Sequence, residues 1–202
     1  MTTRFILASA SPARRQTLLR AGVTPEVIVS GLDESSVDPE SSTPAEFAQL
    51  LANTKAKLVA AGIRGEALVL GCDSLLEFDG EAVGKPGTTA AAMERWRRIR
   101  GKRGALHTGH CLMDVAAGRV CVATVSTSVD FAEISDDEIE AYCGSGEPSN
   151  VAGGFTIDGY GGWFIEGIHG DPHNVVGVSL PVLRKMMGEL NFRLTDVGYP
   201  AF

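Results

Sequence analysis

The residues around position 9 have the types and spacing that build an anion-binding loop. An apolar run over residues 5–7 leads into a serine-containing loop, and a segment that begins with Pro12 and carries two arginines follows. Proline suits the first position of a helix, and a helix start offers free backbone N–H groups and a positive dipole end. Arg14 would clamp an anion bidentately. The alternative is a serine N-cap followed by a solvated basic turn. The residues expected at the anion are Ser9, Ser11, Arg14 and Arg15.

Two carboxylates further along the chain could complete a polyphosphate site. Asp73 follows residues 67–70, an apolar run expected to form a strand buried on both faces, and we expect Asp73 at the C-terminal end of that strand. Glu34 follows an expected strand over residues 26–30. Mg²⁺ prefers one or two carboxylates beside phosphate and water, so both acids are candidate metal ligands, and either could instead be the general base. For Glu34 the alternative is a solvated loop acid.

Two lysines are candidates for neutralising phosphate oxygens as point charges. Lys55 lies in an expected helix that opens with a capping box at Thr43, and the alternative for a lysine there is a place on the polar face. Lys85 follows an expected β-hairpin with Asp79-Gly80 at its turn, which would return the lysine to the neighbourhood of Asp73.

The motifs that the chain lacks narrow the chemistry. The sequence has no G-x-x-x-x-G-K-[ST], no G-x-G-x-x-G and no G-x-S-x-G, so a P-loop, a dinucleotide-binding fold and a nucleophile elbow lose support. Carboxylates, lysines and an arginine remain. That set suits hydrolysis of a metal-bound polyphosphate, in which the protein positions charge and a water molecule.

Composition agrees with a compact enzyme. With 202 residues, 44% of them hydrophobic, the chain is long enough for one large domain or two closely joined lobes. A net charge of −7 argues against a nucleic-acid-binding protein, and the basic segment 95–103 is expected to be a solvated helix face. Because no apolar run reaches about 18 residues, we expect no membrane segment and a cytoplasmic location. Four scattered cysteines are expected to be reduced core residues: Cys72, Cys111, Cys121 and Cys143.

The remaining pattern alternates strands with helices and predicts a mixed sheet. The first helix is expected to end near Gly22. The other helices are expected over residues 43–58, 88–100, 135–142 and 181–190, and Ser135 with Glu138 is expected to form a capping box. Further strands are expected over residues 106–114, 119–131 and 163–165.

Short motifs in a fixed order connect these candidates to a family. They are Ser9-Ala10-Ser11-Pro12, Gly31-Leu32-Asp33-Glu34, Lys55 within Leu51–Ala56, Gly71-Cys72-Asp73-Ser74, Gly84-Lys85-Pro86, Ser145-Gly146-Glu147-Pro148, Ala152-Gly153-Gly154-Phe155 and Asn174-Val175-Val176-Gly177. Together they resemble the Maf family of nucleoside triphosphate pyrophosphatases over residues 4–190.

The resemblance implies a fold, a reaction and a site. The implied fold is a single α/β domain, residues 1–202, with an elongated mixed sheet flanked by helices and two lobes around a central cleft, as in inosine triphosphate pyrophosphatases. The implied reaction is cleavage of a nucleoside triphosphate between its α- and β-phosphates with Mg²⁺ or Mn²⁺, by a homodimer that removes unwanted nucleotides. The alternative is a nucleotide-binding regulator of cell division that acts through a partner. The implied catalytic and phosphate-binding residues are Ser11, Arg14, Glu34, Lys55, Asp73 and Lys85.

The chain departs from the family where the base is chosen. One subgroup, for dTTP and UTP, carries Arg, Thr and Gln where this sequence has Ala13, Ser74 and Asp158, and the subgroup for methylated GTP carries Trp, Gln and Glu there. Ser74 resembles the first pattern and Asp158 the second, so the preferred base stays open. The family lysine before Ala152-Gly153 is Val151 in this chain.

Overall fold

The structure, a computed structural model, describes residues 2–39 and 42–200. At its centre is a seven-stranded mixed sheet with the order β2-β1-β3-β5-β6-β7, and β4 pairs with β3 outside this row. β1 runs parallel to β2 and β3, and all other pairs are antiparallel. The strands are β1 (Arg4–Leu7), β2 (Glu26–Val27), β3 (Ala67–Phe78), β4 (Glu81–Val83), β5 (Arg103–Asp114), β6 (Arg119–Phe131) and β7 (Ile165–His169).

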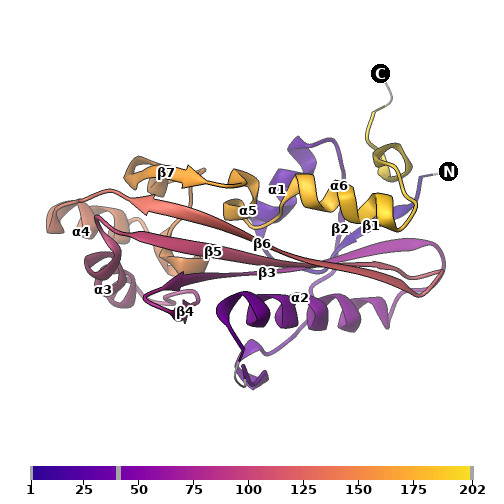
Figure 1. The fold of residues 1–202 in the computed structure, drawn as a ribbon, viewed down its shortest axis with the longest axis horizontal. Coiled ribbons are helices and arrows are strands. Elements are labelled where there is room, and N and C mark those ends of the chain that lie inside the picture. Colours follow the sequence, from indigo (N-terminus) through magenta and orange to yellow (C-terminus); the bar gives the residue numbers. More distant parts are fainter. Residues whose placement is uncertain (1, 40–41, 201–202) are drawn as a thin grey trace.

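Helices cover both faces of this sheet (Figure 1). α2 lies along one face of β3 and β5, while α1, α5 and α6 lie on the other face. The α-helices are α1 (Pro12–Arg20), α2 (Pro44–Ala60), α3 (Thr89–Ile99), α4 (Asp136–Gly144), α5 (Pro172–Val176) and α6 (Leu180–Glu189). The 3₁₀ turns are η1 (Glu34–Ser36), η2 (Pro148–Asn150), η3 (Ala152–Gly154), η4 (Tyr160–Phe164) and η5 (Leu194–Val197). The predicted elongated α/β fold with a mixed, helix-flanked sheet is confirmed.

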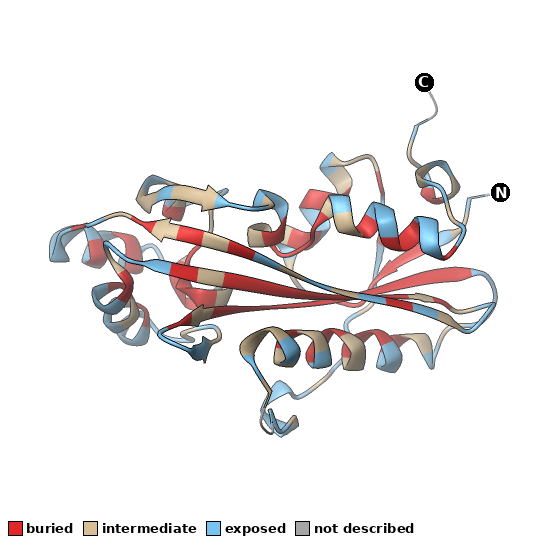
Figure 2. Cartoon of the chain, viewed as in Figure 1, coloured by how far each residue is buried: buried red, intermediate tan, exposed pale blue. Residues whose placement is uncertain are grey.

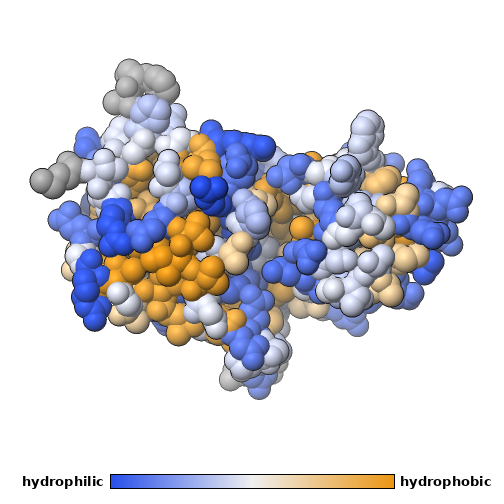
Figure 3. Space-filling view, turned by 180° about the vertical axis from the view of Figure 1, so that it is seen from behind, coloured by the Kyte–Doolittle hydropathy of each residue, from blue (hydrophilic) through white to orange (hydrophobic). Residues whose placement is uncertain are grey.

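Apolar side chains gather separately toward the two ends of the long sheet. At the end that carries the termini, α1 and α6 pack on β1 and β3 through residues such as Leu18, Leu70 and Met186. At the other end, Trp96 of α3 meets Phe131 and Tyr142 edge-on, with ring centroids 5.7 and 5.3 Å away. Figure 2 shows buried residues running through the central strands between these ends, and Figure 3 shows the surface hollowed between them.

Local sequence signals set the starts of the helices as predicted. Ser11 caps α1, and capping boxes begin at Thr43 for α2 and at Ser135 for α4. Both residues of the Asp79-Gly80 turn have positive φ, 53° and 78°, as a type I′ hairpin requires. All four cysteines are free and buried, as expected. None of the helices in the described chain is long and apolar enough to cross a bilayer.

The bounds of β2, β5 and β7 differ from the predicted ones. β2 covers only Glu26–Val27 instead of residues 26–30, because the chain leaves the sheet after Ile28 to reach η1. β7 begins at Ile165 instead of Trp163, since the preceding residues form η4 and Phe164 joins the aromatic cluster around Trp96. β5 begins at Arg103 instead of residue 106.

β3 unites the strand predicted over residues 67–70 with the first strand of the predicted hairpin, residues 75–78. Asp73 was expected at the C-terminal end of a strand over residues 67–70, but β3 continues through it to Phe78. The extension arises because β5 pairs with β3 from Leu68 to Glu77. Asp73 therefore lies in the middle of a central strand, and its position needs an explanation other than a strand end.

Candidate active site

The site residues collect where β3 has an open edge. β5 occupies one side of β3 along almost its whole length. On the other side, β1 pairs only as far as Leu70 and β4 pairs only from Leu76. Among the described strands, residues 71–75 consequently have no partner on that side. This gap begins at the carboxyl end of β1, where open α/β sheets collect their ligands.

Side chains within the gap alternate between the two faces of the sheet. Asp73 points to the face covered by α2, and its neighbour Ser74 points to the face covered by α1. Glycines let α2 approach closely: a Cβ on Gly71 would lie 2.8 Å from the backbone nitrogen of Ala56, and one on Gly109 would lie 2.5 Å from the carbonyl oxygen of Ala48. The close approach of α2 brings its lysine onto the strand.

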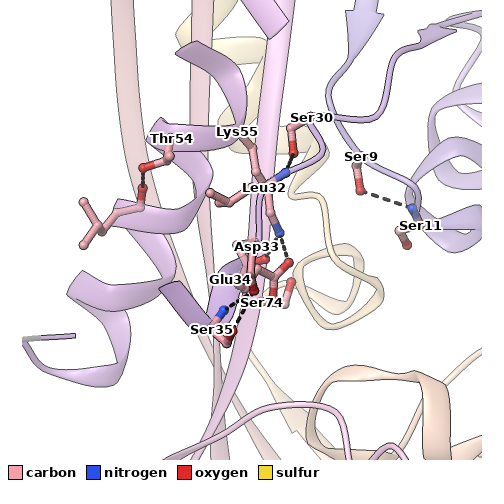
Figure 4. Close-up of polar contacts among 12 residues, drawn as sticks. Ser9, Ser11, Ser30, Leu32, Asp33, Glu34, Ser35, Thr54, Lys55 and Ser74 are labelled. Carbon is pink, nitrogen blue, oxygen red and sulfur yellow. Dashed lines mark hydrogen bonds and ion pairs between the residues drawn. The ribbon is translucent and has the colours of Figure 1, made fainter. Parts of the chain in front are cut away.

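Lys55 joins the two predicted acids. Its Nζ lies 2.5 Å from Oε1 of Glu34 and 2.5 Å from Oδ1 of Asp73. Figure 4 shows Lys55 of α2 pointing toward Glu34. Lys55 and Asp73 are buried, with 8% and 6% of their surfaces exposed, whereas the side chain of Glu34 is half exposed. Glu34 begins η1, which Asp33 caps by accepting a hydrogen bond from the backbone N–H of Ser35. Three segments far apart in sequence thus deliver one cation between two carboxylates.

The two carboxylates titrate differently because their burial differs. Burial raises the pKa of Asp73, and the nearby charges of Lys55 and Arg14 only partly offset this effect. Glu34 is less buried, so the hydrogen bond and charge of Lys55 outweigh its partial burial and lower the pKa of its carboxyl group. Lys85 and Arg14 act on Glu34 in the same direction. Asp73 is therefore the acid of this pair that more readily takes up a proton.

Lys85, which follows the hairpin, is near enough to Glu34 for its charge to act there, and its proximity to Asp73 stays a prediction. It follows β4 by two residues and is exposed, and its positive charge contributes to the lowered pKa of Glu34.

The predicted anion loop lies beside this cluster. Ser9 is buried, and its Oγ accepts hydrogen bonds from the backbone N–H of Ser11, 3.2 Å away, and from Nη1 of Arg14, 3.0 Å away. Ser11 caps α1 with its hydroxyl oxygen, so its hydroxyl hydrogen is available to an anion. Capping and anion binding are therefore compatible at this serine.

The two carboxylates fit a divalent cation. Within residues 2–39 and 42–200, no group of three or more His, Cys, Asp or Glu side chains could hold a metal ion by itself. However, Glu34 and Asp73 converge on one point, the position of Lys55 Nζ. Two convergent carboxylates, completed by water and phosphate oxygens, match the coordination that Mg²⁺ prefers.

The residues predicted to choose the base do not gather at one point in the contacts of the described chain. Ser74 is buried against Arg14, Ala13 is half-buried on α1, and Arg15 is exposed. Asp158 is exposed in the loop before η4, where it accepts a hydrogen bond from Thr156. Their roles in substrate binding stay predictions.

Two residues outside the predicted site contact its side chains, of which Gly177 belongs to a quoted family motif and Thr108 to none. Thr108 on β5 is fully buried and bonds Ser74, and the carbonyl oxygen of Gly177 accepts a hydrogen bond from Arg14. The sequence carries a signal for Thr108: His107-Thr108-Gly109-His110 places small and polar residues between the apolar residues Leu106 and Leu112 of the expected strand. A cavity of about 600 Å³ between α1 and α6 contains none of the predicted site residues.

The arginines of the basic segment 95–103 contact other residues of the same chain. Arg95 donates to the carbonyl oxygen of Gly84, Arg98 pairs with Glu81, and Arg103 pairs with Asp130. These arginines pair with acids or donate to a carbonyl group of the same chain. Arg98 lies exposed on α3 as expected, whereas Arg95 is partly buried and Arg103 lies on β5.

Comparisons with known proteins show the family to which this chain belongs. The family model described as Maf-like protein matches residues 4–190. A nucleoside triphosphate pyrophosphatase of Salinispora tropica is 55% identical, over 96% of this chain and 87% of the relative. Relatives with the same name from Streptomyces coelicolor and Thermosynechococcus vestitus are 52% and 50% identical, covering 98% and 96% of this chain and 96% of each relative. The family model covers both the anion loop and the Glu34–Lys55–Asp73 cluster, and the chain belongs to the Maf family.

Proposed function

We propose that this chain hydrolyses a nucleoside triphosphate between its α- and β-phosphates, releasing the nucleoside monophosphate and pyrophosphate. The observation that carries the proposal is the position of Lys55 Nζ, 2.5 Å from both Glu34 and Asp73 at the open edge of β3. Relatives at 50–55% identity are named nucleoside triphosphate pyrophosphatases, which supports the same reaction class.

The site residues act on the substrate from the two faces of the sheet, on either side of the open edge of β3. Arg14 and the hydroxyl groups of Ser9 and Ser11 bind phosphate oxygens from the α1 face, and Lys55 and Lys85 neutralise negative charge on the other side. One oxygen of the Asp73 carboxylate takes a proton from the attacking water, for which its raised pKa suits it, and its other oxygen stays available as a metal ligand beside Glu34. The water oxygen bonds to the α-phosphorus, the bond from that phosphorus to the bridging oxygen breaks, and pyrophosphate leaves.

Glu34 and Asp73 would hold Mg²⁺ or Mn²⁺. Such an ion supplies charge neutralisation on the phosphate oxygens when it is bound. Lys55 would then give up at least part of its contact with the two carboxylates and turn toward the substrate.

A screen for pyrophosphate release tests the function. The purified chain is incubated with standard and modified nucleoside triphosphates, with and without Mg²⁺ or Mn²⁺. We expect metal-dependent release from at least one triphosphate, and in H₂¹⁸O the label should enter the monophosphate. Label in the pyrophosphate would place the attack on the β-phosphorus. Nucleotide binding without any release would favour the alternative, a nucleotide-binding regulator of cell division.

The proposal also covers the location, the oligomeric state and the partners of the enzyme. We place it in the cytoplasm as a single-domain homodimer that removes unwanted nucleotides without binding nucleic acid or membranes. Light scattering coupled to gel filtration tests the oligomeric state, since a dimer has twice the chain mass of 21.3 kDa.

A further inference from the structure

Arg14 is held by the protein on three of its nitrogens. Nε donates to the carbonyl oxygen of Gly177 at 2.9 Å, Nη1 donates to Oγ of Ser9 at 3.0 Å, and Nη2 donates to Oγ of Ser74 at 2.9 Å. A guanidinium has five N–H groups, one on Nε and two on each Nη. Among the contacts of the described residues, one N–H on each Nη therefore remains for a ligand. N–H groups of Arg14 that the protein does not use can donate charge-assisted hydrogen bonds to phosphate oxygens.

The contact with Ser74 begins a chain of buried hydroxyl groups. Oγ of Ser74 lies 2.9 Å from Oγ1 of Thr108, its cross-strand neighbour, and Thr108 donates to the carbonyl oxygen of Asn174 at 3.0 Å. Each hydroxyl has one hydrogen. Since Thr108 gives its hydrogen to Asn174, Ser74 must give its own to Thr108 and accept from Arg14. All donors thus point from the guanidinium toward Asn174.

The direction of these hydrogen bonds limits what Ser74 can do for a substrate. Its only hydrogen is committed to Thr108, so Ser74 cannot donate one to a substrate base while the chain is intact. The serine is also 8% exposed. Ser74 therefore contacts Arg14, whose guanidinium it helps to hold in place.

The chain of hydrogen bonds ends at Asn174, in the short α5 turn, and this turn is itself held rigidly. The side chain of Asn174 is fully buried, and its Nδ2 donates to the carbonyl oxygen of Leu106 and to Oγ1 of Thr127 at 3.1 Å each. The same turn ends at Gly177, which has a φ of 115° and leaves no room for a side chain, because a Cβ would lie 2.9 Å from Nε of Arg14. Two carbonyl groups of one turn, at Asn174 and Gly177, therefore fix the guanidinium.

We infer that Thr108 is a positioning residue, and that the Arg14–Ser74–Thr108–Asn174 chain orients the two free N–H groups of Arg14 toward the phosphates of the substrate. The inference rests on the proposed function for the identity of the ligand. Small misplacements of a clamp are costly, since its benefit depends on alignment.

The experiment compares Thr108→Val, which removes the hydroxyl at nearly constant volume, with Thr108→Ser, which keeps it. KM and kcat are measured on the best triphosphate of the screen, and Kd for inorganic pyrophosphate by calorimetry. We expect Thr108→Val to raise KM and this Kd about tenfold while Thr108→Ser stays within about twofold of wild type. Ser74→Ala interrupts the same chain one step earlier and should act like Thr108→Val, which covers a failure of the valine variant to fold.

A double-mutant cycle separates positioning from structural damage. In an Arg14→Lys background the guanidinium fork is gone, so Thr108→Val should cause no further loss in KM or in pyrophosphate binding. An undiminished tenfold loss in that background would overturn the inference, as would wild-type values for Thr108→Val and Ser74→Ala. If no triphosphate is hydrolysed, the proposed function fails, but the pyrophosphate Kd still decides the inference. Wild-type protein that does not bind pyrophosphate would overturn the inference too.

Discussion

Asp73 and Ser74 are adjacent on β3 but bind opposite partners, since Asp73 contacts Lys55 of α2 on one face and Ser74 contacts Arg14 of α1 on the other. The two faces meet at an edge only because neither β1 nor β4 pairs with residues 71–75. A triphosphate lying over this edge reaches cations from both helices at once. The missing strand pairing is thus the feature that turns a central strand into a site.

Asp73→Asn should lower kcat at least about 100-fold while the protein still folds, because the substitution removes the base or metal-binding charge at nearly constant volume. Steady-state kinetics and a thermal melt measure the two effects. Asp114→Asn is the matched control, since Asp114 is also a buried aspartate paired with a cation, Arg119, but lies at the far end of β5. Wild-type kcat in Asp73→Asn would remove this residue from the proposed centre.

Gly71→Ala should destabilise the protein and reduce activity together. The added Cβ would meet the backbone of α2 at Ala56, so the helix must shift and carry Lys55 away from Asp73. Overpacking of this kind costs about 1–3 kcal/mol. Chemical denaturation and kcat/KM give the two readouts. Gly188→Ala in α6 serves as the control because no atom lies within 4 Å of the position of its Cβ. Unchanged stability in Gly71→Ala would mean that α2 adjusts without cost.

The stability of the fold should decrease below about pH 6.5 because of His110. Burial and the charge of Arg14 lower the pKa of this histidine from 6.5 to about 4. The neutral ring fits its contacts: Nδ1 donates to the carbonyl oxygen of Thr108, and Nε2 accepts from the backbone N–H of Ser179. Between these two pKa values the unfolded chain binds a proton and the folded chain does not, so stability falls as the pH falls.

The lowered pKa corresponds to roughly 3 kcal/mol over the whole interval. His110→Gln removes the titration but keeps a hydrogen-bonding side chain. The test is the free energy of unfolding from urea titrations at pH 7 and pH 4.5 for both proteins. We expect wild type to lose more stability than His110→Gln between these pH values. An equal loss would show that His110 does not carry the effect.

Local signals in the sequence predicted the local structure well. The capping residues Ser11, Thr43 and Ser135 and the turn at Asp79-Gly80 each act within a few residues, so no knowledge of the fold was needed. The length of β3 was not predictable in this way. Residues 71–75 stay in the strand because β5 pairs with them, and that partner lies more than thirty residues further along the chain.

The same distinction holds in the site. Glu34, Lys55 and Asp73 were identified from residue type and family motif, and the structure brings them together. Thr108 was missed because its role depends on a cross-strand neighbour and on a turn 66 residues away. The sequence pattern indicates which residues could do chemistry, whereas the residues that orient them can be identified only from the packing of the folded chain.

The last prediction concerns the choice of base at Asp158. The loop that carries it is firmly held, because the carboxylate of Glu147 accepts hydrogen bonds from the backbone N–H groups of Tyr160 and Gly161 and from the hydroxyl of Tyr142, at 2.9 Å each. Substitution of the exposed Asp158 side chain should therefore leave the loop in place. A carboxylate facing the base accepts hydrogen bonds from the N–H edge of guanine, whereas uracil and thymine present carbonyl oxygens in part of the same space.

Asp158→Gln should then raise kcat/KM for UTP or dTTP relative to a guanosine triphosphate by about tenfold, roughly 1.4 kcal/mol of differential transition-state binding. Paired kcat/KM values on both substrate types, for wild type and variant, measure the ratio. Asp137→Gln, an exposed acid at the start of α4, is the control and should leave the ratio unchanged. The same ratio in Asp158→Gln as in wild type would mean that this carboxylate does not read the base. The choice would then have to be made near Ala13, because the only hydroxyl hydrogen of Ser74 is given to Thr108.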